Sequence, residues 1–257
     1  MKNKIFTLLL CSGMLLSSSF SNANTKVANF KMLVLTERGG GHEAFVAAAL
    51  EWLQGYALAQ NFEFKVINDT KLIDESFLSG YKVFVQLNYP PYAWTDKAKS
   101  AFEKYIENGN GGWVGFHHAT LLGEFDGYAM WKWYSGFMGG IRFKNYIAAR
   151  ATAQVRIEDR THPVMKGLPE TFTLPDDEWY TFDKSPRVNV KVLANVDESS
   201  YQPPSEVKMG DHPVIWSNEK MKSRNVYFLF GHHANLLKTQ EFKILFANAI
   251  LWASGKG

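Results

Sequence analysis

The stretch Gly112-Trp113-Val114-Gly115-Phe116-His117-His118 decides how this chain is expected to fold. Its first residues read as a buried strand, and two histidines follow at the end of that strand. Open α/β sheets bind their ligands in the crevice at the carboxyl ends of the strands. We therefore expect the two imidazoles to lie where ligands bind, and to be candidates for chemistry as well as for packing.

The same arrangement occurs at two other places in the chain. The strand-like run 30–36 leads into a glycine-rich segment that ends at His42, and the run 226–230 leads into Gly231-His232-His233. Five of the seven histidines thus follow apolar, strand-like runs. A single histidine in such a loop more often makes an ordinary hydrogen bond. Three junctions at equivalent strand ends favour one shared site.

Strand-like and helix-like segments alternate along the first half of the chain, and the alternation loosens beyond residue 120. Strands are expected at 30–36, 62–67, 82–87, 112–117, 153–158, 190–195, 213–217 and 226–230. Helices are expected at 44–59, 95–106 and 240–253, and 163–183 reads mostly as loop. This order predicts an α/β protein with three layers, α/β/α, around a mostly parallel, flavodoxin-like central sheet.

Composition limits the kinds of partner. A chain of 257 residues suits one large α/β domain, and a net charge of +3 with scattered lysines and arginines does not predict a nucleic-acid partner. Aromatic residues make up 15% of the sequence. That fraction suits either a large core or a cleft that stacks on sugars, and Trp131, Trp133 and Tyr134 fit both interpretations.

The amino terminus has the pattern of an export signal. Lys2 and Lys4 precede an apolar run at 5–16, and small residues up to Ala23 suit signal peptidase. We expect residues 1–23 to be a signal peptide and 24–257 a single domain, periplasmic or secreted, because the apolar run is too short to span a bilayer. Cys11, the only cysteine, lies inside that run and leaves lipid attachment as the alternative. A mature chain without cysteine has no disulfide and no thiolate nucleophile.

Several short motifs, weak singly, together carry a resemblance to a known family. They are Gly39-Gly40-Gly41-His42, Gly115-Phe116-His117-His118-Ala119-Thr120, Thr161-His162-Pro163-Val164, Gly167-Leu168-Pro169, Asp176-Asp177-Glu178-Trp179-Tyr180, Pro213-Val214-Ile215-Trp216, the strand 226–230 with Gly231-His232, and Leu251-Trp252-Ala253. In order and spacing the chain resembles the ThuA-like (trehalose utilisation) family from about residue 31 to 253. The resemblance implies the fold of class I glutamine amidotransferases and a small-molecule carbohydrate as partner.

The chain departs from the amidotransferases at their nucleophile. Their cysteine sits in a sharp turn of the form G-x-C-x-G, and the corresponding residues here are Gly115 to Ala119, with His117 in the place of the cysteine. Without a thiol the turn cannot form a thioester, so glutaminase chemistry is excluded, although the turn itself can remain.

The candidate site combines the strand-end histidines with one carboxylate. We expect His42, His117 and His232 to be catalytic, with Glu178 as their partner. The candidate substrate-binding residues are Arg38, Gly40, Gly41, Glu43, His118, Trp179 and His233. The glycines lack the Walker lysine and the dinucleotide spacing, so no nucleotide cofactor is expected.

Two questions remain open at this stage. His42, His117 and His232 could hold zinc or another divalent metal, or one histidine could act as base and another as acid on a sugar or keto-sugar. The chain could also be a carbohydrate-binding module without catalytic activity, relying on aromatic residues and tolerating loss of its histidines.

Overall fold

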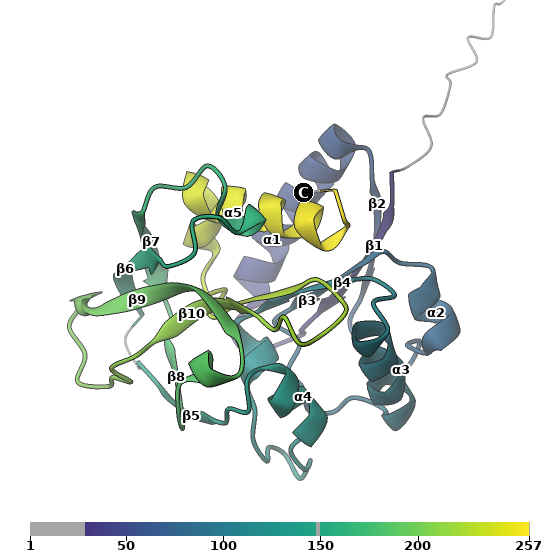
Figure 1. Ribbon diagram of the computed structural model, residues 1–257, viewed down its shortest axis with the longest axis horizontal. Coiled ribbons are helices and arrows are strands. Elements are labelled where there is room, and N and C mark those ends of the chain that lie inside the picture. The colour runs from purple at the N-terminus through teal and green to yellow at the C-terminus, as the bar shows by residue number, and fades with distance from the viewer. Residues whose placement is uncertain (1–28, 148–149, 257) are drawn as a thin grey trace, which may run out of the picture.

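The computed structural model describes residues 29–147 and 150–256 (Figure 1). The expected signal peptide and Cys11 lie outside the described residues. Within these described residues, no helix is long and apolar enough to cross a membrane.

A nine-stranded sheet forms the middle layer, and its first half is parallel (Figure 1). In spatial order this half contains β2 (Glu63–Ile67), β1 (Lys31–Thr36), β3 (Val83–Leu87), β4 (Gly112–Phe116) and β11 (Asn225–Phe228). The strands β1, β3, β4 and β11 consist almost wholly of buried residues, as expected for parallel strands covered on both faces. Their carboxyl ends meet at one edge of the sheet.

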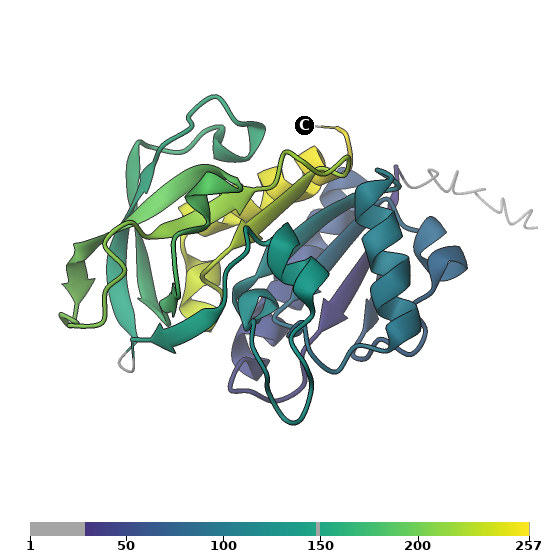
Figure 2. The same ribbon diagram turned by 60° about the horizontal axis from the view of Figure 1, so that its bottom comes forward.

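The second half of the sheet is antiparallel and extends to one side of the parallel half (Figure 2). It contains β10 (Pro213–Ser217), β9 (Lys191–Gln202), β6 (Ala151–Ile157) and β7 (Thr171–Asp177). A separate two-stranded sheet pairs β5 (Phe143–Tyr146) with β8 (Tyr180–Phe182). The sequence-based expectation of loop at 163–183 is therefore wrong for β7 and β8. β7 is an edge strand in which Phe172 and Leu174 are the buried apolar residues, so pairing with β6 decides its structure more than its composition does.

Helices cover both faces of the sheet, which confirms the three-layer α/β fold (Figure 1). On one face lie α1 (Glu43–Gln60) and α5 (Gln240–Ala253); on the other lie α2 (Glu75–Ser79), α3 (Asp96–Glu107) and α4 (Lys132–Phe137). Four short 3₁₀ helices are η1 (His117–Thr120), η2 (Pro163–Met165), η3 (Pro186–Val188) and η4 (Ala234–Lys238). Thr95 caps α3 by accepting a hydrogen bond from the Ala98 N–H at 3.2 Å, as its position before that helix predicts.

Aromatic side chains fill the layer between the sheet and α3. Phe102 of α3 packs against Phe84 and Trp113 of the sheet, and against Trp131 and Tyr134 around α4. Trp131 and Tyr134 are buried, so the core interpretation of these aromatic residues is correct and sugar stacking by them is not supported. The indole N–H groups of Trp131 and Trp133 donate to Glu103 and Glu107 of α3.

Candidate functional site

Four histidines from three strand ends come together at the carboxyl edge of the parallel sheet. We call His42, His117, His118 and His232 the histidine cluster. The ring of His42 lies 5.1 Å from that of His117, 4.2 Å from that of His118 and 4.6 Å from that of His232, centroid to centroid. The cluster forms because β1, β4 and β11 run parallel and end at the same edge of the sheet.

His117 sits in a strained turn between β4 and η1. Its φ of 40° is positive, which is uncommon for a residue other than glycine, Asn or Asp. The hydroxyl of Tyr227 donates to the His117 carbonyl at 2.8 Å and helps to hold this backbone. Strained backbone of this kind is common where a side chain must be presented to a ligand. The turn expected at this position is therefore present, with an imidazole on it.

A single carboxylate orients two rings of the cluster. Glu37 directly follows β1; its Oε2 lies 2.7 Å from His42 Nδ1 and its Oε1 lies 2.8 Å from His118 Nδ1. Burial alone would raise the pKa of Glu37, but the hydrogen bonds and charges of His118 and His42 outweigh burial and lower it. The carboxylate therefore stays ionised and accepts a hydrogen bond from the Nδ1–H of each ring; in the neutral imidazole this tautomer leaves the lone pair on Nε2.

His117 is held in the same tautomer by a different partner. Its Nδ1 lies 2.9 Å from the Leu229 carbonyl oxygen, which can only accept, so Nδ1 carries the proton. The Nε2 atoms of His42 and His117 are buried and have no hydrogen-bond partner among the described residues. Burial, followed by the charges of neighbouring histidines, lowers the pKa of His117 well below its usual value. The ring is neutral at physiological pH, and its Nε2 is an unsatisfied acceptor.

Glu178 approaches this unsatisfied nitrogen. Its Oε2 lies 3.3 Å from His117 Nε2, without the geometry of a hydrogen bond. Two acceptors this close call for a proton or a cation between them. Burial raises the pKa of Glu178, although the charges of His232 and His42 oppose that effect. The ring of Tyr180 packs against His117 with centroids 4.2 Å apart. The structure thus brings Glu178 to the cluster, as expected for the carboxylate partner.

Asp177 fixes the loop that carries His232. Its fully buried carboxylate accepts hydrogen bonds from the backbone N–H groups of Gly231, His232 and His233 at 2.8, 2.9 and 3.0 Å. Burial raises the pKa of Asp177 to about 7, against the opposing effect of these donors. The short segment after β11 is thereby tied to the end of β7.

Replacing Asp177 with alanine is expected to lower the free energy of unfolding by about 2–3 kcal/mol at pH 5, because the buried N–H of Gly231 and the part-buried N–H groups of His232 and His233 lose their acceptor. Urea unfolding measures this change. Asp183→Ala is the control: this exposed aspartate accepts from a single backbone N–H, that of Arg142, and its loss should cost no more than about 1 kcal/mol.

The pH dependence of the Asp177→Ala effect follows from the raised pKa. The native state holds a proton on Asp177 up to about pH 7, whereas the unfolded chain releases it near its usual value, so Asp177 contributes less stability as pH rises through that window. The stability difference between wild type and Asp177→Ala should therefore narrow from pH 4 to pH 7. A difference that widens over this range would contradict the assignment.

The two glycines of the predicted substrate set lie against the cluster. A Cβ on Gly40 would come within 3.0 Å of Glu37 Oε1 and of His42 Nδ1, and a Cβ on Gly41 would lie 3.9 Å from His232 Nε2. Both have positive φ. Glycine at position 40 thus allows the backbone to pass the Glu37–His42 pair.

Other predicted residues lie away from the rings. With its amide oriented for bonding, Asn68 accepts from Arg38 Nε at 2.8 Å, beside the end of β2. Glu43 is exposed in the first turn of α1. His233 caps η4 by accepting from the Asn235 N–H. Trp179 is fully buried and donates to the Ala151 carbonyl, so it is a core residue, and the substrate contact expected from it is corrected.

Both His117 and His118 reach the site, as expected, because the backbone turns sharply into η1 at His117. As a consequence the three histidines whose ligand atoms lie within 4.8 Å of one another are His42, His117 and His118. The expected set of metal ligands contained His232 in place of His118.

The sequence-based set omitted Glu37, Asp177 and Tyr180. Glu37 follows its strand just as the histidines follow theirs, so the same rule could have selected it. Asp177 belongs to the acidic group from which only Glu178 was chosen. Of the histidines outside the cluster, His162 caps η2, and His212 is buried between Glu198 and the Tyr180 carbonyl, where it supports β8.

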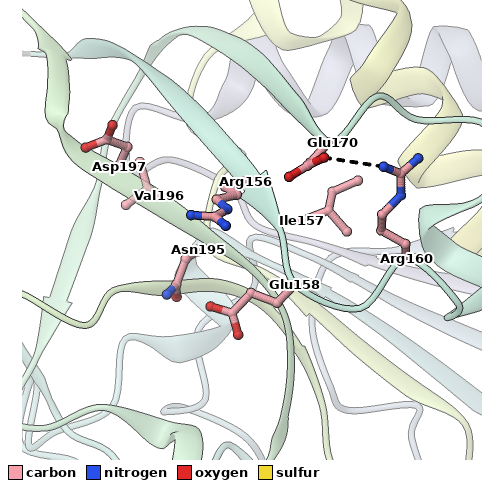
Figure 3. Close-up of a pocket in the computed structure, with 8 residues that line it drawn as sticks. All are labelled: Arg156, Ile157, Glu158, Arg160, Glu170, Asn195, Val196 and Asp197. Carbon is pink, nitrogen blue, oxygen red and sulfur yellow. Dashed lines mark ion pairs between the residues drawn. The ribbon is translucent and has the colours of Figure 1, made fainter.

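A surface pocket of about 690 Å³ lies on the antiparallel half, away from the cluster (Figure 3). Its residues come from β6 and β9 and the segments that follow β6 and precede β7. Figure 3 shows that basic and acidic side chains mix along it, with Arg160 and Glu170 paired at 3.5 Å. None of its lining residues carries an imidazole.

Comparison with known proteins agrees with this architecture. No curated protein matches the sequence. A ThuA-like protein from Bacteroides uniformis is 30% identical, with a TM-score of 0.79 over 89% of this chain and 92% of that one. A ThuA-like protein from Parabacteroides merdae is 18% identical, with a TM-score of 0.67 over 88% and 90%. The glutaminase domain of CTPS from Trypanosoma brucei shares the fold at 9% identity, with a TM-score of 0.53 over 90% and 95%.

The family described as ThuA, trehalose utilisation, matches residues 31–253, a span that contains every residue of the histidine cluster. With nearly the whole described chain covered, this protein belongs to the ThuA family, which places it in carbohydrate utilisation.

Proposed function

We propose that this protein is an exported enzyme of carbohydrate metabolism that acts on a sugar or keto-sugar derivative at the histidine cluster. One observation carries the proposal: ring nitrogens of His42, His117 and His118 come within 4.8 Å of one another, and the buried Nε2 atoms of His42 and His117 have no hydrogen-bond partner among the described residues. Buried polar atoms without a partner are costly unless a ligand uses them.

The donor set suits a divalent metal, of which zinc is the candidate. The ligand atoms of His42, His117 and His118 lie within 4.8 Å of one another, against about 3.4 Å around a tetrahedral zinc with bonds near 2.0 Å. Histidines that bind zinc give their other ring N–H to a carboxylate or a carbonyl, as these three do to Glu37 and Leu229. A metal bound here would polarise a substrate carbonyl or lower the pKa of a bound water.

Glu178 and Tyr180 supply groups for moving protons beside the cluster. Glu178 is partly exposed, at 17% of its side chain, and burial raises its pKa, so its carboxyl group is a candidate for both taking up and releasing a proton. A carboxyl group next to a polarised carbonyl can remove a proton from the neighbouring carbon, the step that isomerases and eliminating lyases of keto-sugars need. The metal-free version gives the same role to Glu178 with His117 as its partner.

Glutaminase activity does not fit this site. His117 occupies the turn where the cysteine of an amidotransferase would stand, and an imidazole cannot form the thioester intermediate. We therefore propose that this chain uses the scaffold for chemistry on carbohydrates other than glutamine hydrolysis.

The test is a metal analysis of the purified protein followed by a screen of glycosides and 3-keto-glycosides. We expect bound zinc or another divalent ion, and turnover that disappears with a chelator and returns with the ion. Turnover that is indifferent to chelator would support the acid/base version. Sugar binding without turnover of any glycoside or keto-glycoside would favour the binding-module alternative.

Export is a separate part of the proposal, based on residues 1–23 of the sequence. Cleavage after Ala23 is expected, so intact-mass measurement of protein from the periplasm or medium should give a chain that begins at Asn24. A chain that begins at Cys11 with the added mass of lipid would contradict cleavage at Ala23.

A further inference from the structure

Three aromatic side chains gather beside the histidine cluster, and the proposed chemistry does not use them. We call Tyr92, Phe125 and Tyr128 the aromatic patch. The ring of Tyr92 lies 5.5 Å from that of Phe125 and 6.2 Å from that of Tyr128. Tyr128 is 47% exposed, one of the few large apolar side chains so open to solvent in the described part of the chain.

A tight turn presents two of these rings. Asp126 and Gly127 have φ of 53° and 81°, and the Tyr128 N–H donates to the Phe125 carbonyl at 2.8 Å. Positive φ at both central residues is typical of a type I′ turn, which Asp-Gly favours. Phe125 and Tyr128 flank the turn and form an isolated antiparallel β-bridge with each other. Their positions are thus set by the backbone before any ligand arrives.

The aromatic patch is connected to the histidine cluster by ring contacts. Phe125 lies 6.3 Å from Phe143, Phe143 lies 4.8 Å from Tyr180, and Tyr180 lies 4.2 Å from His117. Tyr92 follows β3, the neighbour of β1 and β4, so it belongs to the same edge of the sheet. The pKa of Tyr92 is raised by burial and, further, by the charges of Asp126 and Glu37, which agrees with this closeness.

We propose that the aromatic patch binds a second sugar ring of the substrate, one that does not react, so that the preferred substrate is at least a disaccharide. This inference rests on the proposed function, because it takes the histidine cluster to be the place of reaction. A sugar ring has an apolar face of C–H groups and a rim of hydroxyls. Aromatic faces suit the first, and the carboxylates of Glu124 and Asp126, both exposed in the same loop, suit the second.

The charges around the aromatic patch argue for a sugar over other occupants. An anionic lipid surface would need basic residues, whereas the loop carries Glu124 and Asp126, and Arg142 is paired with Glu124 at 3.7 Å. Three rings give little area compared with a stable protein interface. A neutral ligand with many hydroxyls, such as a sugar ring, remains.

Binding measured by calorimetry tests the inference without any need for turnover. The probes are glucose and the disaccharides trehalose, maltose and cellobiose. The double variant Tyr92→Ala/Tyr128→Ala should bind at least one disaccharide about threefold to tenfold more weakly than wild type, as expected for the loss of ring stacking. Its affinity for glucose should be unchanged, because one ring occupies only the cluster.

The control is Tyr81→Ala. Tyr81 is also half-buried and packs on another ring, Phe77, with centroids 5.3 Å apart, but it precedes β3 and lies at the opposite edge of the sheet. The Tyr81→Ala variant should bind every probe with the affinity of the wild type. Circular dichroism and zinc affinity, both expected to be unchanged in all variants, separate loss of the patch from loss of the fold.

The outcomes distinguish this inference from the proposed function. Equal disaccharide affinity in wild type and double variant, or no disaccharide binding by wild type, would overturn the aromatic patch as a sugar site, while zinc binding and turnover would still support the cluster. If p-nitrophenyl glucoside were the only probe whose binding depended on the aromatic patch, the patch would bind an aromatic group and not a second sugar. That result would also overturn the inference. Absence of metal and turnover together with patch-dependent binding would refute only the proposed chemistry.

Discussion

Replacement of His117 with alanine is expected to lower turnover on the responsive keto-glycoside or glycoside by about 10² or more. The ring is neutral and fully buried, its Nδ1 is held by the Leu229 carbonyl, and its Nε2 faces Glu178. Whether this nitrogen binds a metal or moves a proton, alanine removes it from beside Glu178. Replacement with cysteine should not create glutaminase activity, because a thiol at the turn does not supply the rest of that machinery.

The His117 variants need a control for the strained backbone. Alanine tolerates the φ of 40° less well than asparagine does, so His117→Asn keeps the turn while it removes the imidazole. His162→Ala removes a histidine that caps η2 and packs on Trp252, and should leave turnover unchanged. If His42, His117 and His232 could each become alanine with activity undiminished, the histidine-centred proposal would fail and the binding module would be preferred.

Replacement of Glu37 with glutamine is expected to weaken zinc binding by about 10- to 100-fold. Glu37 accepts a hydrogen bond from His42 on one oxygen and from His118 on the other. Glutamine offers one oxygen and one NH₂ group. The ring that faces the NH₂ must accept at Nδ1 and carry its proton on Nε2, which removes that nitrogen as a metal ligand.

Competition titration with a zinc indicator measures this effect independently of turnover. Glu43→Gln is the matched control, an exposed carboxylate at the start of α1 that should leave the affinity unchanged. The pKa of Glu37 is lowered in the native state, so Glu37 stabilises the fold at neutral pH and this contribution is lost as pH falls through its lowered value. Equal zinc affinity in wild type and Glu37→Gln would rule out the proposed ligand set.

The histidine cluster lies at the same turn of the fold that holds the nucleophile in amidotransferases. The turn after β4 keeps a strained residue at the carboxyl edge of the sheet, and His117 is that residue. Glu37 after β1 and His232 after β11 converge on it from either side. A strand-end turn that presents a thiol in amidotransferases presents an imidazole here, without any change of fold.

The sequence by itself determined the parallel half of the fold and the edge at which the site lies. Residues 31–36, 83–87 and 112–116 are mostly apolar runs bounded by glycines or turns, a pattern typical of parallel strands that are buried on both faces. His42, His117 and His232 could be brought together from the sequence because parallel strands end at a common edge. The chemistry of imidazoles called for a carboxylate partner, and the resemblance to the family selected Glu178 from the acidic group 176–178.

The tertiary structure alone decided which atoms meet. The antiparallel strand β7 depends on pairing with β6, and the place of Trp179 in the core depends on the Ala151 carbonyl, a contact far away in sequence. The third histidine whose ligand atom lies close to those of His42 and His117 is His118 and not His232. This depends on the sharp turn into η1 and on the two oxygens of Glu37. Periodicity in a sequence reports which face of an element is buried; it carries no information on ring direction or on long-range hydrogen bonds, because these are set by packing between elements.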